Sequence, residues 1–546
     1  MRAVLALCAV GATLAQQPGK TEDGPQLLLQ ECGKDGVCEE HLTAMTMDAS
    51  FRNQHNASKG GWQGCIVAAG MWNTKLCPDP KTCAKNCAID GLDLDAYQDG
   101  HGMTEVDGGI RLKYITATEY GLNIGARAYM IDKTTNKYRV FKLKNREIAF
   151  DVDVSTLPCG VNVALYLVGM DEDGGKGVGN NDAGALYGTG YCDARCQHSP
   201  NFMQGEANFG WVHGACCAEI DLWEANRKDT AMTVHPCGHT GFKRCSGTKQ
   251  CGDTDKGHHY QSLCDKDGCD FNPYRMGAHG FFGEGAKVDS TEKITVVTQF
   301  ITDDGTDSGT LSEIKRFYMK GSLIIQNPGS TVPGVEGNSI NDGYCKAQKK
   351  AFESTRARKN PDGAYDQFSE KGGLAKISES LDQGMVLAMS LWDDPGSNMN
   401  WLDSKAPKGH LDAPGAVRGP CSRDAGKVED VRKTNQMASA EFTNIMYGEI
   451  GSTVKSKPGL EADFALGPVR VDEGAPGARR WLAAATLAAA ASVTLVAFAA
   501  ASAFRGRRRR SYAAARAQEE RAGEAEHSGE MAAPLAPAAA DDTQMA

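Results

Sequence analysis

Residues 216–226 read Cys-Cys-Ala-Glu-Ile-Asp-Leu-Trp-Glu-Ala-Asn and place three carboxylates on a segment that otherwise resembles a β-strand. Because side chains alternate between the two faces of a strand, Glu219 and Asp221 are expected on one face and Ile220 and Leu222 on the other. Glu224 has the opposite parity to Asp221. It joins the other two carboxylates only if one extra residue interrupts the pleat, so the segment predicts a β-bulge.

With the bulge, Glu219 and Glu224 are spaced like the two acids that cleave a glycosidic bond. Their Cα atoms are expected about 13 Å apart. Inward-leaning side chains narrow the carboxyl gap to about 5–6 Å, the spacing of glycosidases that retain anomeric configuration. Like charges this close raise the pKa of one group, so one acid donates a proton while the other is the nucleophile, tuned by Asp221. The alternative interpretation is a solvated acidic edge strand.

The surrounding motifs resemble glycoside hydrolase family 7, the cellobiohydrolases and endoglucanases that act on cellulose. The similarity runs in family order from about residue 30 to residue 453. The segments that carry it include Cys-Ala-Lys-Asn-Cys at 83–87, Tyr-Gly-Thr-Gly-Tyr-Cys-Asp at 187–193, Val-His-Pro-Cys at 234–237, Cys-Asp-Lys-Asp-Gly-Cys-Asp at 264–270, Asn-Pro-Tyr-Arg at 272–275, Ser-Leu-Trp-Asp-Asp at 390–394 and Gly-Glu-Ile-Gly-Ser-Thr at 448–453.

This resemblance implies a role for each matching residue. It makes Glu219 the nucleophile, Glu224 the acid/base and Asp221 the residue that hydrogen-bonds the nucleophile. The positions that line the subsites near the cleaved bond are Tyr166, Asp193, His235, Asp267, Arg275 and Arg418. Trp392 and Trp401 match sugar-stacking platforms that flank the bond, where an indole covers the apolar face of glucose. Taken alone, either tryptophan would be interpreted as a core residue.

Strand patterns along the chain predict an all-β protein. Runs rich in β-formers occur at 148–154, 294–300 and 387–392. Glycine accounts for 63 of 546 residues, above the usual share of about 7%, which indicates many turns and bulges. The resemblance implies a large curved antiparallel β-sandwich, a concanavalin-like jelly roll, in which long disulfide-tied loops cover a substrate groove.

The cysteines predict an oxidising compartment. Of the 19, Cys8 lies in an apparent signal peptide, and the remaining 18 form an even set. The resemblance implies the pairs Cys32–Cys38, Cys65–Cys87, Cys77–Cys83, Cys159–Cys421, Cys192–Cys217, Cys196–Cys216, Cys237–Cys264, Cys245–Cys251 and Cys269–Cys345. A zinc site in the Cys/His-rich stretch from Cys237 to Cys269, where His239, His258 and His259 also lie, is the alternative, although the spacings in this stretch match no zinc pattern. No metal or cofactor is expected.

The two ends of the chain predict secretion and membrane attachment. Residues 1–15 resemble a signal peptide, 16–455 form the family 7 catalytic domain, and 456–480 form a linker. Residues 481–504 are 24 uncharged residues, enough to cross a bilayer. The five arginines that follow place the tail, 505–546, in the cytosol, and its composition predicts disorder.

We therefore expect a single-pass type I membrane protein with an extracellular or lumenal catalytic domain, secreted if the anchor is cleaved. A soluble alanine-rich helix is the alternative for 481–504. Asn56 begins the sequon Asn-Ala-Ser, in an expected polar loop, and predicts a glycoprotein. The net charge is −10, or −15 without the five arginines (−10 − 5 = −15), which argues against nucleic acid as a partner and is compatible with a neutral glucan. A monomer is expected.

Loop lengths give conflicting indications of the mode of cleavage. The 12 residues between Cys251 and Cys264 favour a covered product side, as in cellobiohydrolases. The short stretch 208–214, and Phe51 and Asn53 where related enzymes often have tryptophans, favour a more open groove. His259 and Arg195 replace an arginine and a glutamine of the product site. The 354–366 insertion has no counterpart that we can place.

Our interpretation is a retaining cellobiohydrolase-like enzyme with a partly open tunnel that releases mainly cellobiose from cellulose. An endo-β-1,4-glucanase on the same scaffold is the first alternative. A membrane-tethered glucan-binding adhesin is the second, although a binding protein has no need of both Glu219 and Glu224 at this spacing.

Overall fold

The computed structural model describes residues 17–58, 63–68, 70–119, 121–253, 258–353, 366–407 and 410–455. These residues belong to one unit of the chain, built mainly from antiparallel strands. The predicted signal peptide, linker, membrane segment and tail lie outside the described residues, as does most of the 354–366 insertion. Within the described ranges, no helix is both long and apolar enough to cross a bilayer.

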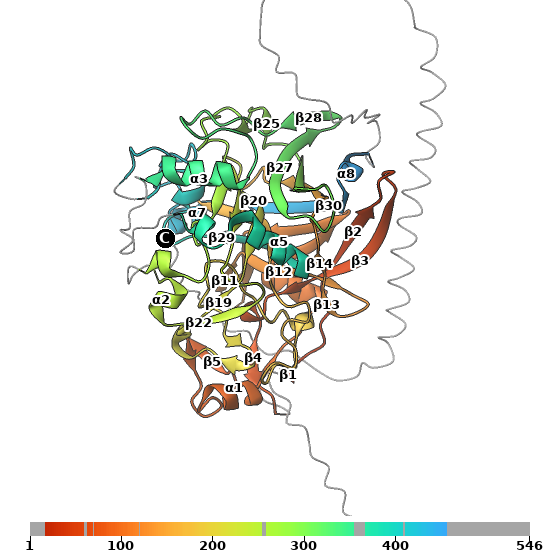
Figure 1. Ribbon diagram of the computed structural model, residues 1–546. Helices are drawn as coiled ribbons and strands as arrows, with labels where there is room; N and C mark the ends of the chain where they lie inside the picture. Colours follow the sequence, from red (N-terminus) through yellow and green to blue (C-terminus); the bar gives the residue numbers. More distant parts are fainter. Residues whose placement is uncertain are drawn as a thin grey trace, which may run out of the picture. The chain divides into compact units, whose positions relative to one another are not determined.

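One layer of strands, layer A, carries the segment 216–226. Its central strand β20 (Glu219–Ala225) pairs in antiparallel fashion with β16 (Val161–Val168) on one side and β21 (Thr230–His235) on the other. The other members are β23 (Cys269–Phe271) beside β21, and β29 (Met385–Asp393), β12 (Ala126–Asp132) and β3 (Cys38–Met47) beyond β16. Strands β20, β29 and β12 occupy the middle of Figure 1.

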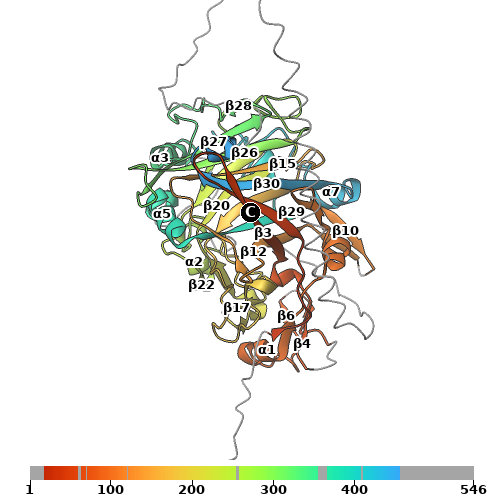
Figure 2. The same ribbon diagram turned by 90° about the vertical axis from the view of Figure 1, so that its right-hand side faces the viewer.

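A second layer, layer B, lies against the first. In it β15 (Arg146–Asp153) pairs with β26 (Ile294–Thr302) and β30 (Ser439–Glu449), as Figure 2 shows. The other members are β27 (Leu311–Lys320) and β28 (Leu323–Gln326) beyond β26, and β9 (Gly109–Lys113) and β8 (Met103–Val106) beyond β30. Strand β2 (Gln26–Cys32) pairs with both β3 and β30 and joins the layers.

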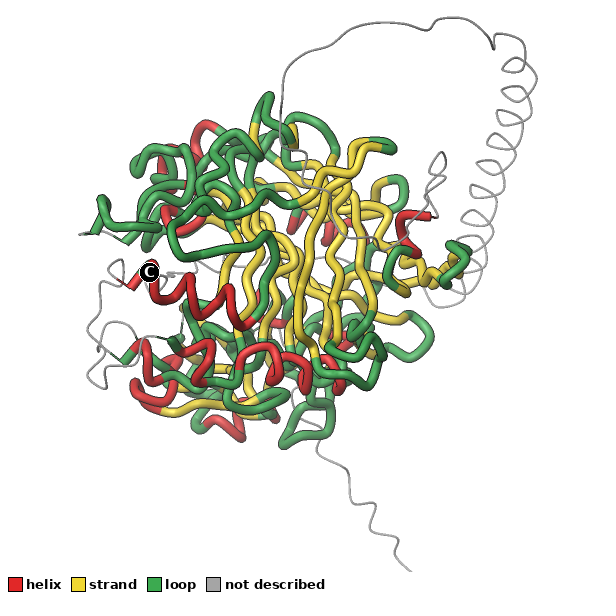
Figure 3. The backbone as a smooth tube through the Cα atoms, turned by 45° about the horizontal axis from the view of Figure 1, so that its top comes forward, coloured by secondary structure: helices red, strands yellow, loops and turns green. Residues whose placement is uncertain are grey.

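The strands predicted from the sequence are confirmed, since two of the β-rich runs fall within β26 and β29 and the third, 148–154, lies within β15 except for its last residue. The long strands run alongside one another in Figure 3. Alternate side chains of each layer form a common core between them, as expected for a β-sandwich. Trp223 of β20, for example, makes edge-on contacts with Phe150 of β15 and Tyr318 of β27, at 6.4 Å between ring centroids in each case.

Shorter elements surround the two layers. The small strands are β1 (Gln17–Pro18), β4 (Gln54–Asn56), β5 (Ile66–Ala68), β6 (Met71–Trp72), β7 (Cys87–Ile89), β10 (Ile115–Thr118), β11 (Gly121–Ile124), β13 (Lys137–Tyr138), β14 (Val140–Phe141), β17 (Phe202–Met203), β18 (Glu206–Ala207), β19 (His213–Cys216), β22 (Lys243–Ser246), β24 (Phe282–Gly283) and β25 (Val288–Asp289). The α-helices are α1 (Pro80–Asn86), α2 (Gly247–Cys251), α3 (Asp342–Ala351), α4 (Gln367–Glu370), α5 (Gly373–Gln383), α6 (Asn400–Asp403), α7 (Val428–Thr434) and α8 (Ser452–Lys455).

Nine disulfides tie the loops to this framework, and they are the nine pairs that the resemblance implied. Because Cys237, Cys264 and Cys269 are all paired, their thiols are not available to a zinc ion, and the alternative zinc site is wrong. The expectation for Asn56 needs a correction. This residue ends strand β4 rather than lying in a loop, and its side chain accepts hydrogen bonds from Ser58.

Candidate active site

Strand β20 contains the bulge that the sequence predicts. Opposite β16, Asp221 pairs with Tyr166 and Trp223 with Leu165, so Leu222 is the extra residue. Opposite β21, the register also shifts by one residue between Asp221 and Glu224. Leu222 and Trp223 consequently both belong to the core, and Glu224 returns to the face that carries Glu219 and Asp221.

The face of layer A that points away from the core is polar around this bulge. On the two strands beside β20, it carries Asn162 and Tyr166 of β16 and Thr233 and His235 of β21. One strand farther out, Trp392 of β29 pairs with Asn162. Alternation alone accounts for this arrangement, because the residues between them, such as Val163 and Val234, face the core.

Glu219 is buried, with 7% of its surface exposed. Its Oε2 accepts a hydrogen bond of 3.0 Å from the backbone N–H of Ala194. Burial, and then the neighbouring Asp221 and Asp193, raise the pKa of Glu219 well above its ordinary value, while His235 acts in the opposite direction. The N–H donor and His235 both favour the ionised carboxylate, which a nucleophile requires.

Asp221 lies beside His235, with 3.2 Å between Asp221 Oδ2 and His235 Nε2. The other ring nitrogen of His235, Nδ1, lies 2.8 Å from the backbone oxygen of Asp265, so it carries the proton and donates it. Gly268 closes against this ring, because a Cβ there would lie 2.5 Å from His235 Cε1, and its φ of +62° also suits glycine. Burial and Asp193 raise the pKa of Asp221 to about 8.

Glu224 has different partners from the other two acids. Asn162 Nδ2 donates to its Oε1 at 3.0 Å, and Thr233 Oγ1 donates to its Oε2 at 3.4 Å. Burial and the neighbouring Asp221 raise the pKa of Glu224 to about 8. At neutral pH this carboxyl therefore holds a proton that it can transfer to a ligand.

A chain of hydroxyl groups connects Asp193 to β16. Tyr191 donates to Asp193 Oδ2 at 2.8 Å, and its hydroxyl lies 3.3 Å from that of Tyr166. The guanidinium of Arg127, on β12, lies 3.6 Å from the centre of the Tyr191 ring. This cation lowers the pKa of Asp193, although burial outweighs it and the net shift is upward.

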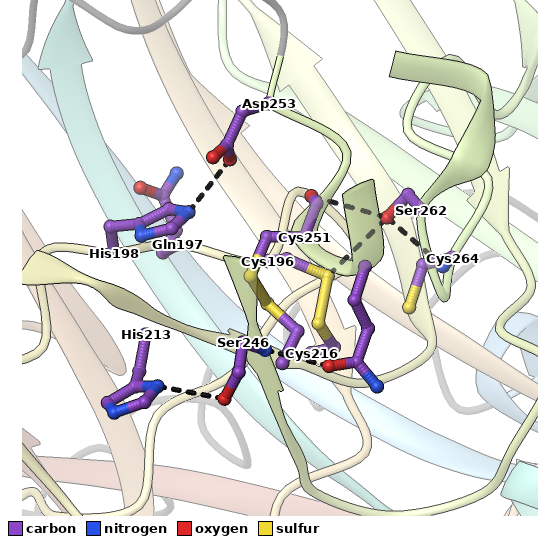
Figure 4. Close-up of a disulfide and its surroundings, with 12 residues drawn as sticks. Cys196, Gln197, His198, His213, Cys216, Ser246, Cys251, Asp253, Ser262 and Cys264 are labelled. Atoms are coloured by element: carbon purple, nitrogen blue, oxygen red, sulfur yellow. Dashed lines mark hydrogen bonds and ion pairs between the residues drawn. A yellow bond between two sulfur atoms is a disulfide. The ribbon is translucent and has the colours of Figure 1, made fainter. Parts of the chain in front are cut away.

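Two disulfides fix the loop that supplies Asp193 and the Ala194 N–H. Cys192–Cys217 and Cys196–Cys216 connect this loop to Cys216 and Cys217, which Ala218 separates from the start of β20. Figure 4 shows Cys196 and Cys216 with their polar surroundings. There His198 lies 3.0 Å from Asp253, which connects the same loop to the segment after α2. The Ala194 N–H that donates to Glu219 is thus held in place by a disulfide on each side of it in the loop.

Two predicted arginines form a second charged group. Arg275 donates to Asp270 Oδ1 at 2.5 Å, and its Nε donates to the backbone oxygen of Gly415. Burial and the neighbouring Arg275 lower the pKa of Arg418 to about 10. The Nε of Arg418 is buried and has no hydrogen-bond partner in the described part of the chain. Asp267 is exposed and lies 2.7 Å from His259 Nε2.

The two predicted tryptophan platforms form one aromatic surface. The rings of Trp392 and Trp401 lie 6.0 Å apart at an angle of 27°. Both are partly exposed and pack on the small cluster that contains Ala231, the residue opposite Glu224. The structure therefore places this apolar surface next to the acid, rather than as two separate platforms.

Apart from disulfide-bonded cysteines, one set of possible metal ligands occurs among the described residues. It comprises Glu219, Asp221 and His235, whose ligating atoms lie within 4.8 Å of one another. The same atoms are those that the chemistry described below requires.

The sequence analysis missed several residues of the site. Asn162 is the single amide in an otherwise apolar buried strand, four positions before Tyr166, and this spacing places both on one face. Tyr191 lies inside a quoted motif, but its position gave no indication that it would link Tyr166 to Asp193. Ala194 acts through its backbone, which no sequence pattern identifies.

Comparisons with known proteins agree with this geometry. Solved structures similar to this chain include a family 7 cellobiohydrolase from Daphnia pulex, with 42% identity, a TM-score of 0.75, and coverage of 80% of this chain and 100% of that one. A Melanocarpus albomyces cellobiohydrolase complexed with cellotetraose has 34% identity, a TM-score of 0.72, and coverage of 80% and 99%. A Humicola insolens endocellulase has 34% identity, a TM-score of 0.67, and coverage of 80% and 100%.

The family model described as glycosyl hydrolase family 7 matches residues 17–454, nearly the whole of the described part of the chain. The arrangement of carboxylates on β20, the nine disulfides and the extent of this match agree with one another. The chain therefore belongs to glycosyl hydrolase family 7, whose members compared here are cellulases.

Proposed function

We propose that this enzyme hydrolyses β-1,4-glucosidic bonds of cellulose with retention of anomeric configuration. The observation that carries the proposal is the bulge of β20, which brings Glu219, Asp221 and Glu224 to one face while giving each carboxylate different partners. Two acids in different environments on one face suit the two roles of a double displacement.

In the first step, Glu224 transfers its proton to the glycosidic oxygen while Glu219 attacks the anomeric carbon. A glycosyl ester forms on Glu219, and the shortened glucan leaves with the proton. In the second step Glu224, now ionised, removes a proton from water, and the water oxygen displaces Glu219 from the sugar. The second inversion restores the original configuration and both carboxyl groups.

Asp221 and His235 support the nucleophile. A carboxyl with a pKa of about 8 is protonated at neutral pH, so Asp221 donates a hydrogen bond rather than adding a third charge. Glu219 then carries the negative charge of the group, assisted by the Ala194 N–H. The paired rings of Trp392 and Trp401 bind a glucose face next to Glu224.

We further propose a cellobiohydrolase-like mode that releases mainly cellobiose. Its support is the segment after α2, which the disulfide Cys245–Cys251 and the His198–Asp253 contact attach close to the catalytic loop. An endoglucanase remains the second candidate, because the stretch 208–214 is short and the compared structures include an endocellulase.

Product analysis of residues 16–455 tests these proposals together. Proton NMR of the first sugar released from cellotetraose is expected to show the β-anomer, and α-cellobiose as the first product would exclude retention. On amorphous cellulose, cellobiose with little loss of viscosity supports the exo mode. A rapid fall in viscosity with few new reducing ends supports the endo mode, and binding without turnover would support the adhesin.

For localisation we propose a type I membrane protein anchored by 481–504, with the catalytic domain on the extracellular or lumenal side. The support is the length and charge pattern of the sequence alone. Carbonate extraction of membranes from producing cells is expected to leave the full chain in the pellet. Its appearance in the supernatant would contradict a spanning segment.

A further inference from the structure

An arginine from layer B reaches across the sandwich core to the catalytic strand. Arg316 lies on β27 with only 3% of its surface exposed. Its Nη2 donates to the backbone oxygen of Leu222, the extra residue of the bulge. The contact therefore joins strand β27 of layer B to the bulge of β20 in layer A.

The Leu222 carbonyl needs such a partner. Leu222 is skipped in the register with β16 and in the register with β21. The residue that a bulge inserts is not part of the regular ladder, and a buried backbone oxygen without a donor costs about 1–3 kcal/mol. The guanidinium supplies the missing donor from the core side.

Among the described residues, no carboxylate forms an ion pair with Arg316 that would account for its burial. Its remaining contacts in the described part of the chain are neutral, namely Thr298 Oγ1 at 3.3 Å and the hydroxyl of Tyr318. Burial lowers its pKa, and its Nε has no partner among the described residues. A buried cation without a carboxylate opposes folding, so its presence is better explained by what it holds in place.

Aromatic packing holds the next residue of the bulge. Trp223 contacts Phe150 and Tyr318 as described above, and its ring lies 5.8 Å from that of Phe282. Arg316 and Tyr318 are two positions apart on β27 and face the same way. Layer B therefore contacts both core-facing residues of the bulge: it binds the carbonyl oxygen of Leu222 and packs against the ring of Trp223.

We propose that Arg316 is a positioning residue, which fixes the bulge of β20 and thereby sets the placement of Glu224 relative to Glu219. This inference rests on the proposed function. When the hydrogen bond from Arg316 to Leu222 is removed, the segment between Asp221 and Glu224 relaxes. Glu224 then no longer lies within hydrogen-bond distance of the glycosidic oxygen. A displacement of about 1 Å at a catalytic group reduces the rate about 100-fold.

The test compares two substrates with wild type, Arg316→Met, Arg316→Lys and Thr298→Val. Cellotetraose needs proton donation from Glu224, whereas 2,4-dinitrophenyl β-cellobioside has a leaving group that departs without it. We expect Arg316→Met to lose about 100-fold in kcat/KM on cellotetraose. The burst of dinitrophenol, which reports the first step alone, should slow less than about 5-fold, since Glu219 remains in place.

The other variants provide controls. Arg316→Lys retains a cationic donor and should recover most of the lost rate, which also covers the case in which Arg316→Met fails to fold. Thr298→Val removes the second acceptor of Arg316 but not the contact with Leu222, and should stay within about 3-fold of wild type on both substrates. Far-UV circular dichroism and a cooperative thermal transition confirm that each variant is folded.

Equal losses on the two substrates would overturn the proposal, because they would indicate fewer competent molecules rather than a displaced acid. Unchanged kinetics in Arg316→Met, or losses in Arg316→Lys as large as in Arg316→Met, would overturn it as well. Failure of the proposed function is recognised separately. In that case wild type itself would show no dinitrophenol burst and would release the α-anomer from cellotetraose.

Discussion

Two buried charged groups lie in the same unit and differ in how their charges are compensated: the three carboxylates of β20, and the pair of Arg275 with Asp270. Glu219, Asp221 and Glu224 have no lysine or arginine in ion-pair contact within the described residues, and burial raises the pKa of all three. Arg275, by contrast, is paired with Asp270, whose pKa lies below its ordinary value because Arg275, Arg418 and Gln348 together outweigh the effect of burial.

The difference separates reactive groups from fixed ones. Burial without a counter-charge keeps Glu224 protonated near neutral pH, so that it can give its proton to a substrate. Compensated charges stay ionised and hold their geometry, as a binding site for hydroxyl groups requires. Neutralising one residue should therefore lower the electrostatic cost of burying the first group. In the second group it should leave a buried charge without its partner.

The largest effect is expected for Glu219→Gln. An amide cannot form the glycosyl ester, so hydrolysis of cellotetraose should fall by on the order of 10⁴-fold or more, as for other lost nucleophiles. The control is Glu292→Gln, which changes an exposed glutamate paired with Lys320 and should leave the rate unchanged. Substantial activity in purified Glu219→Gln would remove this residue from the mechanism.

A large loss of stability is expected for Arg275→Met. It leaves the Asp270 carboxylate buried without its cation, which costs about 3–5 kcal/mol in free energy of unfolding. Arg111→Met, which disrupts the exposed pair with Glu441, should cost at most about 1 kcal/mol. Urea unfolding at pH 7 measures both.

The double variant Arg275→Met, Asp270→Asn should recover much of that loss, because no unpaired charge remains. If Arg275→Met were no less stable than Arg111→Met, the contrast between the two buried groups would be wrong.

An opposite and smaller effect on stability is expected for Glu224→Gln. The pKa of Glu224 is about 8 in the folded protein against 4.5 as its ordinary value. Between these values the folded state binds more protons than the unfolded state, so stability falls as pH rises. The amide removes this dependence and should stabilise the protein by about 2 kcal/mol at pH 7.

That gain should disappear as the pH is lowered to about 4, where Glu224 is protonated in both states. Thermal unfolding of wild type and Glu224→Gln across pH 4 to 8 provides the measurement. A gain of equal size at both ends would show that the pKa of Glu224 is not its cause.

The smallest effect is expected for Asp221→Asn, as a shift of the pH profile. On the basic limb, near its own pKa of about 8, Asp221 becomes ionised and its charge raises the pKa of both Glu219 and Glu224, so Asp221→Asn lowers both there. The profile of kcat/KM on cellotetraose should move to lower pH by about one unit. Movement of the basic limb to higher pH would contradict the assignment of Asp221 as the charge that raises the pKa of the acid.

Much of this architecture could be predicted from the sequence because its signals are local. The parity of Glu224 predicted the bulge, runs rich in β-forming residues predicted β15, β26 and β29, and family resemblance implied all nine disulfides. Each of these depends on spacing along the chain, or on a known relative.

Other features depend on which strands become neighbours, and no single segment encodes that order. The contact of Asn162 with Glu224 requires β16 to lie beside β20, and that of Arg316 with Leu222 requires β27 to pack behind it. The close pairing of Trp392 with Trp401 likewise requires α6 to fold back over the end of β29. These features emerge only once the layers are assembled.

The most direct test of the central claim is to trap the intermediate on the bulged strand. The protein is incubated with 2,4-dinitrophenyl 2-deoxy-2-fluoro-β-cellobioside, digested, and the labelled peptide is sequenced by tandem mass spectrometry. The account predicts one fluorocellobiosyl group, on Glu219. A label on Asp221 or Glu224, or a protein that turns over cellotetraose but never becomes labelled, would contradict it.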